Sequence, residues 1–190
     1  MICEYDYLMK QAILEAKRSL DEGEVPVGAV LADAGGRILA SAHNQPITLR
    51  DPTAHAEILA LRAGGKCLHN YRLPDTILVV TIEPCAMCMG AILHARISKL
   101  VFGAFDTKAG AAGSIYNLPV DRRLNHSMEV VSGIMEEECV SLLKDFFDHR
   151  RREIRTRRRG TEVVVTGSTR NRLVPLRAGH VGSNPTLSAK

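Results

Sequence analysis

The sequence predicts an α/β fold in which a central five-stranded mixed sheet lies between two layers of helices. Three observations favour this fold. Strand-like and helix-like patterns alternate along residues 4–158. The segment 76–82 is apolar and β-branched almost throughout, as in a strand covered on both faces. Two further apolar segments near the N-terminus flank a glycine-containing turn, which indicates an antiparallel hairpin.

The N-terminal half supplies the first helix, the hairpin and a second helix. Apolar side chains recur at helical spacing in the first segment, and Asp33-Ala34-Gly35-Gly36 forms the predicted turn of the hairpin. Gly64-Gly65 is expected to end the second helix. The elements expected here are a helix over 4–21, strands over 25–32 and 37–42, a loop over 43–52 and a helix over 52–63.

The C-terminal half continues the alternation. Pro84 fits the first turn of a helix, where its missing N–H is not needed. The last helix has glutamates at its start and arginines at its end, which complements the helix dipole. The elements expected here are a strand over 76–82, a helix over 84–95, a strand over 99–105, a loop over 106–127, a strand over 129–134 and a helix over 135–158.

Composition places the chain among globular proteins. It has 190 residues, of which 45% are hydrophobic and 24% charged. No apolar run reaches the length of a membrane span, and the first residues carry acids where a signal peptide carries bases. We therefore expect a soluble cytoplasmic protein with one domain over residues 1–158.

Charge is distributed unevenly along the chain. Residues 1–149 carry 14 Lys/Arg against 19 Asp/Glu, whereas residues 150–190 carry 11 against 2. A basic segment of this kind suits a phosphate backbone, although arginines also stabilise a helix C-terminus. Residues 159–190 lack an apolar face, so a basic, disordered tail is expected. The codons for residues 182–185 could match the T-arm of a tRNA gene, so an alternative is a reading frame that runs into such a gene.

The cysteines point to a metal site. Their number is odd, which argues against a disulfide framework. Cys85 and Cys88 have metal-ligand spacing near a predicted helix start, where a thiolate is favoured, and His55 near another helix start offers a third ligand. Cys3, Cys67 and Cys139 are expected to be small apolar fillers.

Three protein ligands predict a catalytic zinc site, because the fourth position remains for water. A structural site would need a fourth ligand. His94 could supply it, but the helix turns it away from Cys85 and Cys88. We therefore favour the open site and keep structural zinc as the alternative.

Glu57 is the predicted general base. Two thiolates and a neutral imidazole bring a Zn²⁺ site close to zero charge, so a nearby base is useful to take a proton from the bound water. Glu57 lies two residues after His55 and could pass that proton to a leaving nitrogen. The alternative is an acid that only stabilises the helix N-terminus. The set of roles describes hydrolytic deamination by a zinc-activated water.

Further segments carry a resemblance to a known family, in addition to Pro52–Glu57 and Glu83–Cys88. They are Glu24–Val30, Asn44–Ile47, Asp51–Thr53, Asn70–Leu73, Val101–Ala104, Gly110–Ser114, Asn125-His126 and Asp145–Phe147. With them, the chain resembles the bacterial tRNA-specific adenosine deaminases of the cytidine-deaminase-like superfamily over about residues 5–155. The resemblance implies the three-layer fold of that superfamily, a homodimer, one Zn²⁺ per subunit, and conversion of the wobble adenosine of an arginine tRNA to inosine.

The resemblance also implies residue roles. His55, Cys85 and Cys88 would bind zinc, and Glu57 would move the proton. The residues implied in contacts with the RNA are Asn44, Asp106, Phe147, Arg150 and Arg151. Asn44 could instead be a turn residue before Pro46, and one of the two adjacent phenylalanines, Phe146 or Phe147, is expected to pack in the core.

The chain departs from the family at Phe105, where an arginine is common, and in the loop 118–123, which leaves the RNA contacts open. Two other functions remain in view. One is a deaminase of free cytosine, guanine or cytidine, which needs no basic helix end. The other is a zinc-stabilised RNA-binding module without activity, in which replacing Glu57 would cost nothing.

Overall fold

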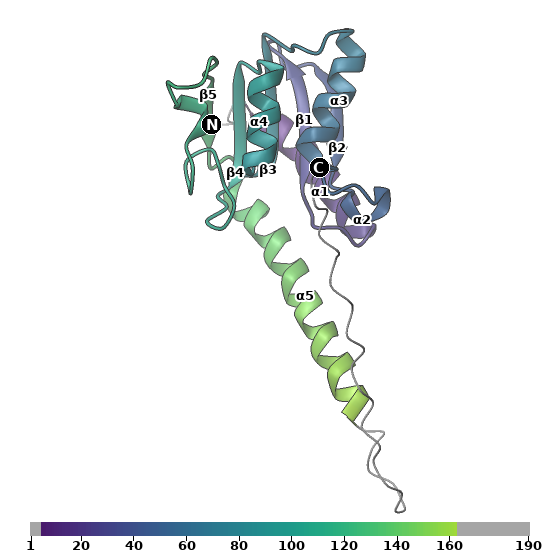
Figure 1. Cartoon of the computed structure of the whole chain (residues 1–190). Helices are drawn as coiled ribbons and strands as arrows, with labels where there is room; N and C mark the ends of the chain where they lie inside the picture. Colours follow the sequence, from purple (N-terminus) through teal and green to yellow (C-terminus); the bar gives the residue numbers. More distant parts are fainter. Residues whose placement is uncertain (1–4, 163–190) are drawn as a thin grey trace, which may run out of the picture. The chain divides into compact units, whose positions relative to one another are not determined.

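Five strands form one mixed sheet in the order β2-β1-β3-β4-β5 (Figure 1). They are β1 (Gly28–Asp33), β2 (Ile38–His43), β3 (Thr76–Ile82), β4 (Lys99–Ala104) and β5 (Glu129–Ser132). β1 pairs antiparallel with β2 and β3, whereas β3, β4 and β5 run parallel. The computed structural model describes residues 5–162, and it confirms the predicted mixed sheet and its hairpin.

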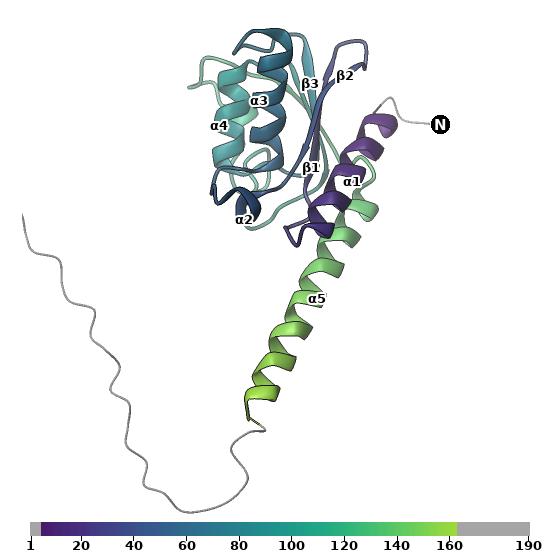
Figure 2. The ribbon, with the colours of Figure 1, turned by 90° about the vertical axis from the view of Figure 1, so that its right-hand side faces the viewer.

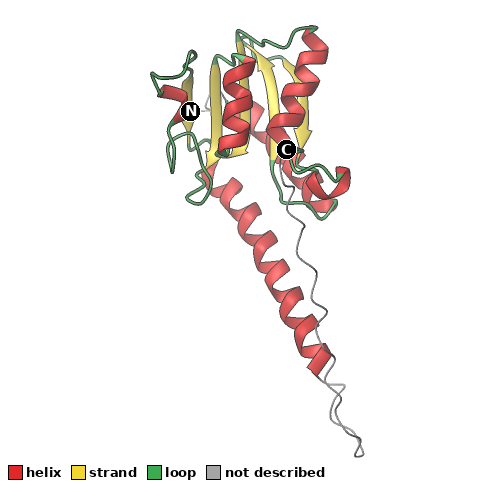
Figure 3. Cartoon of the chain, in the orientation of Figure 1, coloured by secondary structure: helices red, strands yellow, loops and turns green. Residues whose placement is uncertain are grey.

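Helices cover both faces of the sheet (Figures 2 and 3). α3 (Ala56–Leu68) and α4 (Ala86–Ala95) lie on one face. α1 (Asp6–Asp21) and the first turns of α5 (Glu136–Glu162) lie on the other. A short α2 (Pro46–Leu49) and a 3₁₀ turn (Leu118–Val120) interrupt the two long loops. The predicted three layers are therefore confirmed.

Each face of the sheet has its own apolar core. Leu78 and Val80 of β3 point to the α3/α4 side, and Ile77 and Val79 point to the α1/α5 side. Successive side chains of a strand alternate between faces, so a strand buried on both sides reads as an unbroken apolar run. This is why the bounds of β3 agree with those predicted from the sequence.

Two helices begin later than their sequences suggest. α3 starts at Ala56 and α4 at Ala86, so His55 and Cys85 are N-cap residues with extended ψ angles of 152° and 172°. Pro84 consequently precedes the helix and does not lie in its first turn. The difference matters for function, because neither side chain caps its own helix by a hydrogen bond, and both lie beside the unpaired N–H groups of a first turn.

The second helix also ends later than predicted. Gly64 and Gly65 lie inside α3, which continues to Leu68, and His69 adopts the left-handed conformation at its end. A Cβ at position 64 would collide with the side chain of Leu31. Gly64 therefore serves the close approach of α3 to β1 and does not act as a helix terminator.

Smaller differences affect the remaining boundaries. β1 begins at Gly28 because residues 25–27 are irregular, and β5 ends at Ser132 before the left-handed Gly133. α5 extends to Glu162. Contacts divide the chain into a compact unit, Met1–Glu153, and a second unit, Ile154–Lys190, whose described part continues α5. Most of the predicted tail, residues 163–190, lies outside the described residues.

Across the described residues, none of the helices combines the length and apolar character needed to cross a membrane.

Gly28 sets the distance between α1 and β1. A Cβ on this residue would meet the backbone N of Ala16 at 2.5 Å and Glu15 Cβ at 2.8 Å. We expect Gly28→Ala to lower the free energy of unfolding by roughly 2 kcal/mol, since overpacking forces backbone shifts. Urea denaturation of the zinc-loaded wild type and variant measures this difference in the free energy of unfolding. Gly35→Ala in the hairpin turn, where the nearest atom is 3.4 Å away, should be near neutral; equal effects would contradict the explanation.

Candidate active site

His55, Cys85 and Cys88 form a cluster with metal-ligand geometry. His55 Nδ1 lies 3.8 Å from Cys85 Sγ and 3.5 Å from Cys88 Sγ, and the three ligand atoms all lie within 4.8 Å of one another. A tetrahedral zinc with Zn–S of about 2.3 Å and Zn–N of about 2.0 Å requires N···S separations of about 3.5 Å. The spacing therefore fits one zinc ion.

The cluster exists because two helix N-termini meet there. His55 begins α3 and Cys85 begins α4, with the first helical hydrogen bonds from Leu59 N to His55 O and from Met89 N to Cys85 O. Cys88, in the first turn of α4, is fully buried behind Cys85. Because a helix N-terminus carries partial positive charge, this position favours thiolates.

The protons of the cluster are shared unequally. Hydrogen bonds with Cys88 and His55 hold the pKa of the Cys85 thiol far below its ordinary value. The adjacent Cys85 and burial raise the pKa of Cys88, and the hydrogen bond to Cys85 raises the pKa of His55. The three groups thus compete for protons while their lone pairs point to one place. A divalent cation can replace those protons, which fits the soft S₂N donor set of zinc.

His94 does not complete the ligand set. Its side chain is exposed late in α4 and lines an outer groove, while the metal-type cluster found among the described residues consists of His55, Cys85 and Cys88. The structure therefore brings together the three residues that the sequence predicts as zinc ligands. Such a site leaves one coordination position for water.

Glu57 is buried beside this cluster. It lies in the first turn of α3 and is only 3% exposed. Burial raises the pKa of its carboxyl group. An acid that only complements a helix dipole stays in solvent, because burying a carboxyl group without a dedicated partner is costly. Its location two residues from His55 therefore calls for another explanation.

Asn44 is fixed at the start of α3. Its side chain is buried, and Oδ1 accepts the N–H of Ala56 at 3.3 Å. Its backbone is held on both sides, since its N–H donates to Val27 O and its carbonyl accepts Ser19 Oγ at 2.8 Å. These bonds hold Asn44 in a fixed position beside the start of α3.

Asp106 lies at the end of β4, in the loop that returns to the cluster. Its N–H donates to Glu83 Oε2 at 3.0 Å, and its Oδ1 accepts the N–H groups of Lys108 and Ala109. Phe105 packs edge-on against Phe102, with ring centroids 5.1 Å apart. Asn44 and Asp106 are therefore both tied to segments that carry zinc ligands.

Sequence reasoning gave no role to two buried glutamates, Glu24 and Glu83. Each is 1% exposed. Glu24 Oε1 accepts the N–H groups of Ile47 and Thr48, both at 2.8 Å, and so holds the turn that follows Asn44. Glu83 holds the loop of Asp106. The sequence does contain one indication of these roles. Each acid is adjacent to an apolar segment, where a carboxylate is expected to be buried and therefore to need hydrogen-bond donors.

The residues predicted to contact RNA from α5 are exposed. They are Phe147, Arg150 and Arg151. Phe147 is exposed, whereas its neighbour Phe146 is half-buried and lines a groove against Leu20 of α1. Arg150 pairs with Glu153, and Arg151 pairs with Asp148. No contact between these residues and the metal cluster is recorded within residues 5–156. Their predicted role in RNA contacts stays a prediction.

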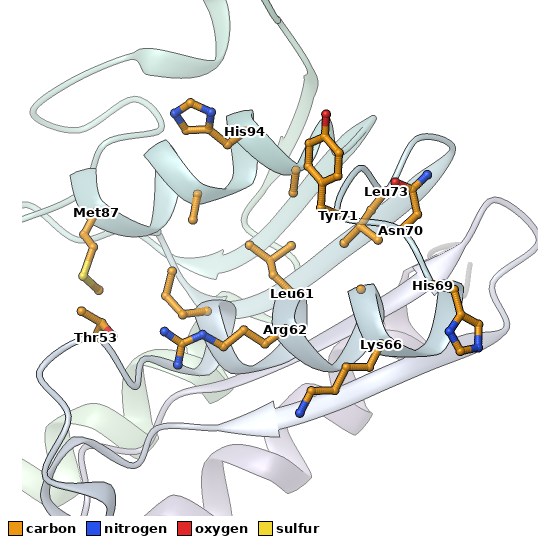
Figure 4. A pocket seen from close by; sticks show the side chains of 14 residues that line it. Thr53, Leu61, Arg62, Lys66, His69, Asn70, Tyr71, Leu73, Met87 and His94 are labelled. Atoms are coloured by element: carbon orange, nitrogen blue, oxygen red, sulfur yellow. The ribbon is translucent and has the colours of Figure 1, made fainter.

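An open groove of about 750 Å³ lies between α3 and α4 (Figure 4). Arg62 and Lys66 of α3 line one side, and Met87 and His94 of α4 line the other. None of the residues that line it is a zinc ligand. The outer surface of these two helices is therefore hollowed and largely apolar.

Comparison with known proteins agrees with this site. Residues 3–104 match the model of the cytidine and deoxycytidylate deaminase zinc-binding region. A tRNA-specific adenosine deaminase of Haemophilus influenzae is 51% identical over 79% of this chain and 87% of that protein. This chain belongs to the tRNA-specific adenosine deaminase family. Its sequence and site identify it as a zinc-dependent hydrolytic deaminase with one Zn²⁺ per chain.

Solved structures place the family more finely. A structure from work on A-to-I editing by tRNA:A34 deaminases is 41% identical, with a TM-score of 0.70, and covers 72% of this chain and 99% of that chain. A guanine deaminase of Bacillus subtilis is 38% identical, with a TM-score of 0.53, over 59% of this chain and 71% of that chain. This member of the tRNA-specific adenosine deaminase family is thus matched more completely by the tRNA-acting structure.

We predict that Cys88→Ser removes most of the zinc, because a hydroxyl group does not replace a buried thiolate as a soft ligand. Metal analysis of the purified protein should give one zinc per chain for the wild type and much less for the variant. Cys67→Ser is the matched control, since Cys67 is an exposed thiol on α3. Full zinc retention in Cys88→Ser would contradict the assigned ligand set.

Proposed function

We propose that this deaminase converts adenosine to inosine at the wobble position of the anticodon of an arginine tRNA. The observation that carries the proposal is the 51% identity to a tRNA-specific adenosine deaminase over 79% of this chain and 87% of that protein, joined to the His55, Cys85 and Cys88 cluster. The reaction adds water at the carbon that bears the amino group, and ammonia leaves.

His55, Cys85 and Cys88 would hold the zinc, which would supply an activated water for the attack. Glu57 would take a proton from the attacking water and return it to the leaving nitrogen. Burial suits this role, since its raised pKa brings the carboxyl group closer to the range in which it can take and return a proton.

Asn44 and Asp106 form the substrate contacts nearest the zinc. The amide nitrogen of Asn44 donates to the edge of the adenine base, and the bond from Ala56 N fixes the orientation of the amide. Asp106 contacts the nucleotide beside the target. Both residues lie on loops anchored to the segments that hold the metal, so base and water meet in a fixed geometry.

Phe147, Arg150 and Arg151 contact the anticodon loop. Phe147 offers an exposed ring for stacking on a base, and the two guanidinium groups are exposed and can exchange their surface carboxylate partners for phosphates. The target base must leave its stack to reach the zinc. This step costs less in a single-stranded loop than in a duplex, which favours an RNA loop as substrate.

A deaminase of a free base is the second candidate, because a guanine deaminase shares the fold and 38% of the aligned sequence. That match covers a smaller part of this chain than the tRNA-acting structure does. The exposed Phe147 and the basic end of α5 serve no purpose for a free base. We therefore give the tRNA priority.

The deciding experiment measures inosine formed on an arginine anticodon stem-loop with adenosine at the wobble position. Glu57→Gln should lower the rate by roughly 10²–10⁴-fold, the usual contribution of a general acid–base group, while zinc content and RNA binding are retained. Glu129→Gln, the same change on the exposed strand β5, is a control for the substitution itself.

The same assay includes free cytosine, guanine and cytidine. Inosine from the RNA alone supports the proposal. Ammonia from a free base, with the RNA unchanged, would replace it by the free-base deaminase. RNA binding by wild-type and Glu57→Gln protein without any product would favour the non-enzymatic module.

We further propose that the protein is a cytoplasmic homodimer, with the outer surface of α4 in the interface. The helix reads Ala-Met-Cys-Met-Gly-Ala-Ile-Leu-His-Ala, so it is apolar on all sides although one side faces the groove of Figure 4. A helix of this kind is normally buried all round. A second copy of the chain provides that cover, and the tRNA substrate places the protein in the cytoplasm.

Ala91→Glu tests the interface, because it places a charge in the middle of this apolar surface. We expect the variant to sediment as a monomer at concentrations where the wild type is a dimer. Leu14→Glu is the control, since Leu14 is an exposed apolar residue of α1 on the opposite side of the sheet. A monomeric wild type, or dissociation by both variants, would contradict the proposed interface.

A further inference from the structure

Glu83 is a buried carboxylate that the zinc chemistry does not use. It lies between β3 and the N-cap Cys85 and is 1% exposed. Oε1 accepts the N–H groups of Ala112 at 2.9 Å and Ser114 at 3.0 Å. Oε2 accepts the N–H of Asp106 at 3.0 Å and the hydroxyl of Ser114. Both oxygens are therefore fully engaged, and all four donors come from one loop.

These bonds close the loop 105–117 upon the start of α4. Ala111 N donates to Pro84 O at 2.9 Å, and Cys85 forms an isolated bridge with Gly110. Glu83 N in turn donates to Ala104 O at 2.8 Å. The loop thus leaves β4 at Asp106, passes the zinc-ligand segment and returns, with the Glu83 carboxylate at its centre.

The fit between the loop and the carboxylate is tight. A Cβ on Gly110 would collide with the carboxyl group of Glu83 and would lie 2.5 Å from Asp106 O. Only glycine lets the backbone pass this close. Backbone N–H groups that converge on a buried anion make charge-assisted bonds, which are stronger than bonds between neutral groups.

We infer that Glu83 is a positioning residue that sets the location of Asp106 relative to the zinc, and so determines how the enzyme holds the nucleotide beside its target. This inference rests on the proposed role of Asp106 in RNA binding. The carboxylate fixes the backbone of Asp106 directly, through its N–H. Oδ1 of Asp106 is occupied by its own turn, so the direction of Oδ2 follows from the same anchor.

Glu83→Gln tests the inference selectively. The amide oxygen can still accept the N–H groups of Ala112 and Ser114, but the amide nitrogen then faces the N–H of Asp106, donor against donor. We expect the KM for the arginine anticodon stem-loop to rise roughly tenfold, the size of one lost charge-assisted bond, with kcat within about twofold and zinc at one per chain.

Asp106→Ala should raise the KM by a similar factor. The double variant, Glu83→Gln with Asp106→Ala, should have a KM no higher than either single variant, because both substitutions remove the same contact with the RNA. Effects that multiply would overturn the inference. So would loss of zinc or a fall in kcat with unchanged KM, since Glu83 would then act through Cys85. Glu129→Gln, the same change on exposed β5, should alter none of these quantities.

A readout without RNA separates this inference from the proposed function. Lys108 is an exposed trypsin site within the loop, and its cleavage requires local opening. Glu83→Gln should accelerate cleavage after Lys108 in the zinc-loaded protein, and Glu129→Gln should not. Unchanged cleavage would overturn the anchor even if the RNA is deaminated. Faster cleavage in a protein that yields no inosine would leave the anchor standing and remove the proposed function.

Discussion

Two helices of this molecule begin at the same point, and each contributes a zinc ligand from its N-cap. His55 and Cys85 have extended backbones at these helix starts, and their side chains meet at 3.8 Å. The partial positive charge of both helix ends favours the thiolates on which the site depends. α3 approaches β1 closely, and a glycine faces Leu31 where the two elements meet. The position of the metal site therefore depends on the two helix starts, and these depend on how the helices pack on the sheet.

Three buried glutamates surround the site, and their partners distinguish them. Glu24 and Glu83 accept backbone N–H groups of neighbouring loops, so their charge is matched in the folded protein. Such carboxylates act as fixed structural anions. Glu57 lies among groups that themselves exchange protons, and burial raises its pKa. A carboxyl group in this state suits proton transfer, whereas the other two suit the holding of loops.

Periodicity and residue type were sufficient to predict the strands, the layers and the zinc ligands. The run from Thr76 to Ile82 has one explanation in a doubly covered sheet, and His-x-Glu with Pro-Cys-x-x-Cys has one main explanation in chemistry. Helix starts were harder to predict, because proline at 52 and 84 suggested a first turn where the chain is not yet helical. The ends of α3 and the roles of Glu24 and Glu83 depend on contacts between segments far apart in sequence. A local pattern does not contain such contacts.

The way Glu83 holds its loop has a consequence for variation. Three of its four bonds go to main-chain N–H groups, at Asp106, Ala112 and Ser114, and any residue except proline can supply such a donor. Gly110 is the exception, because the carboxylate leaves no room for a Cβ. The exposed side chains between Asp106 and Gly110 can therefore be exchanged without disturbing the metal. Evolution, or an engineer who seeks a new sequence preference, has a segment here that can change its chemistry while its backbone path is conserved.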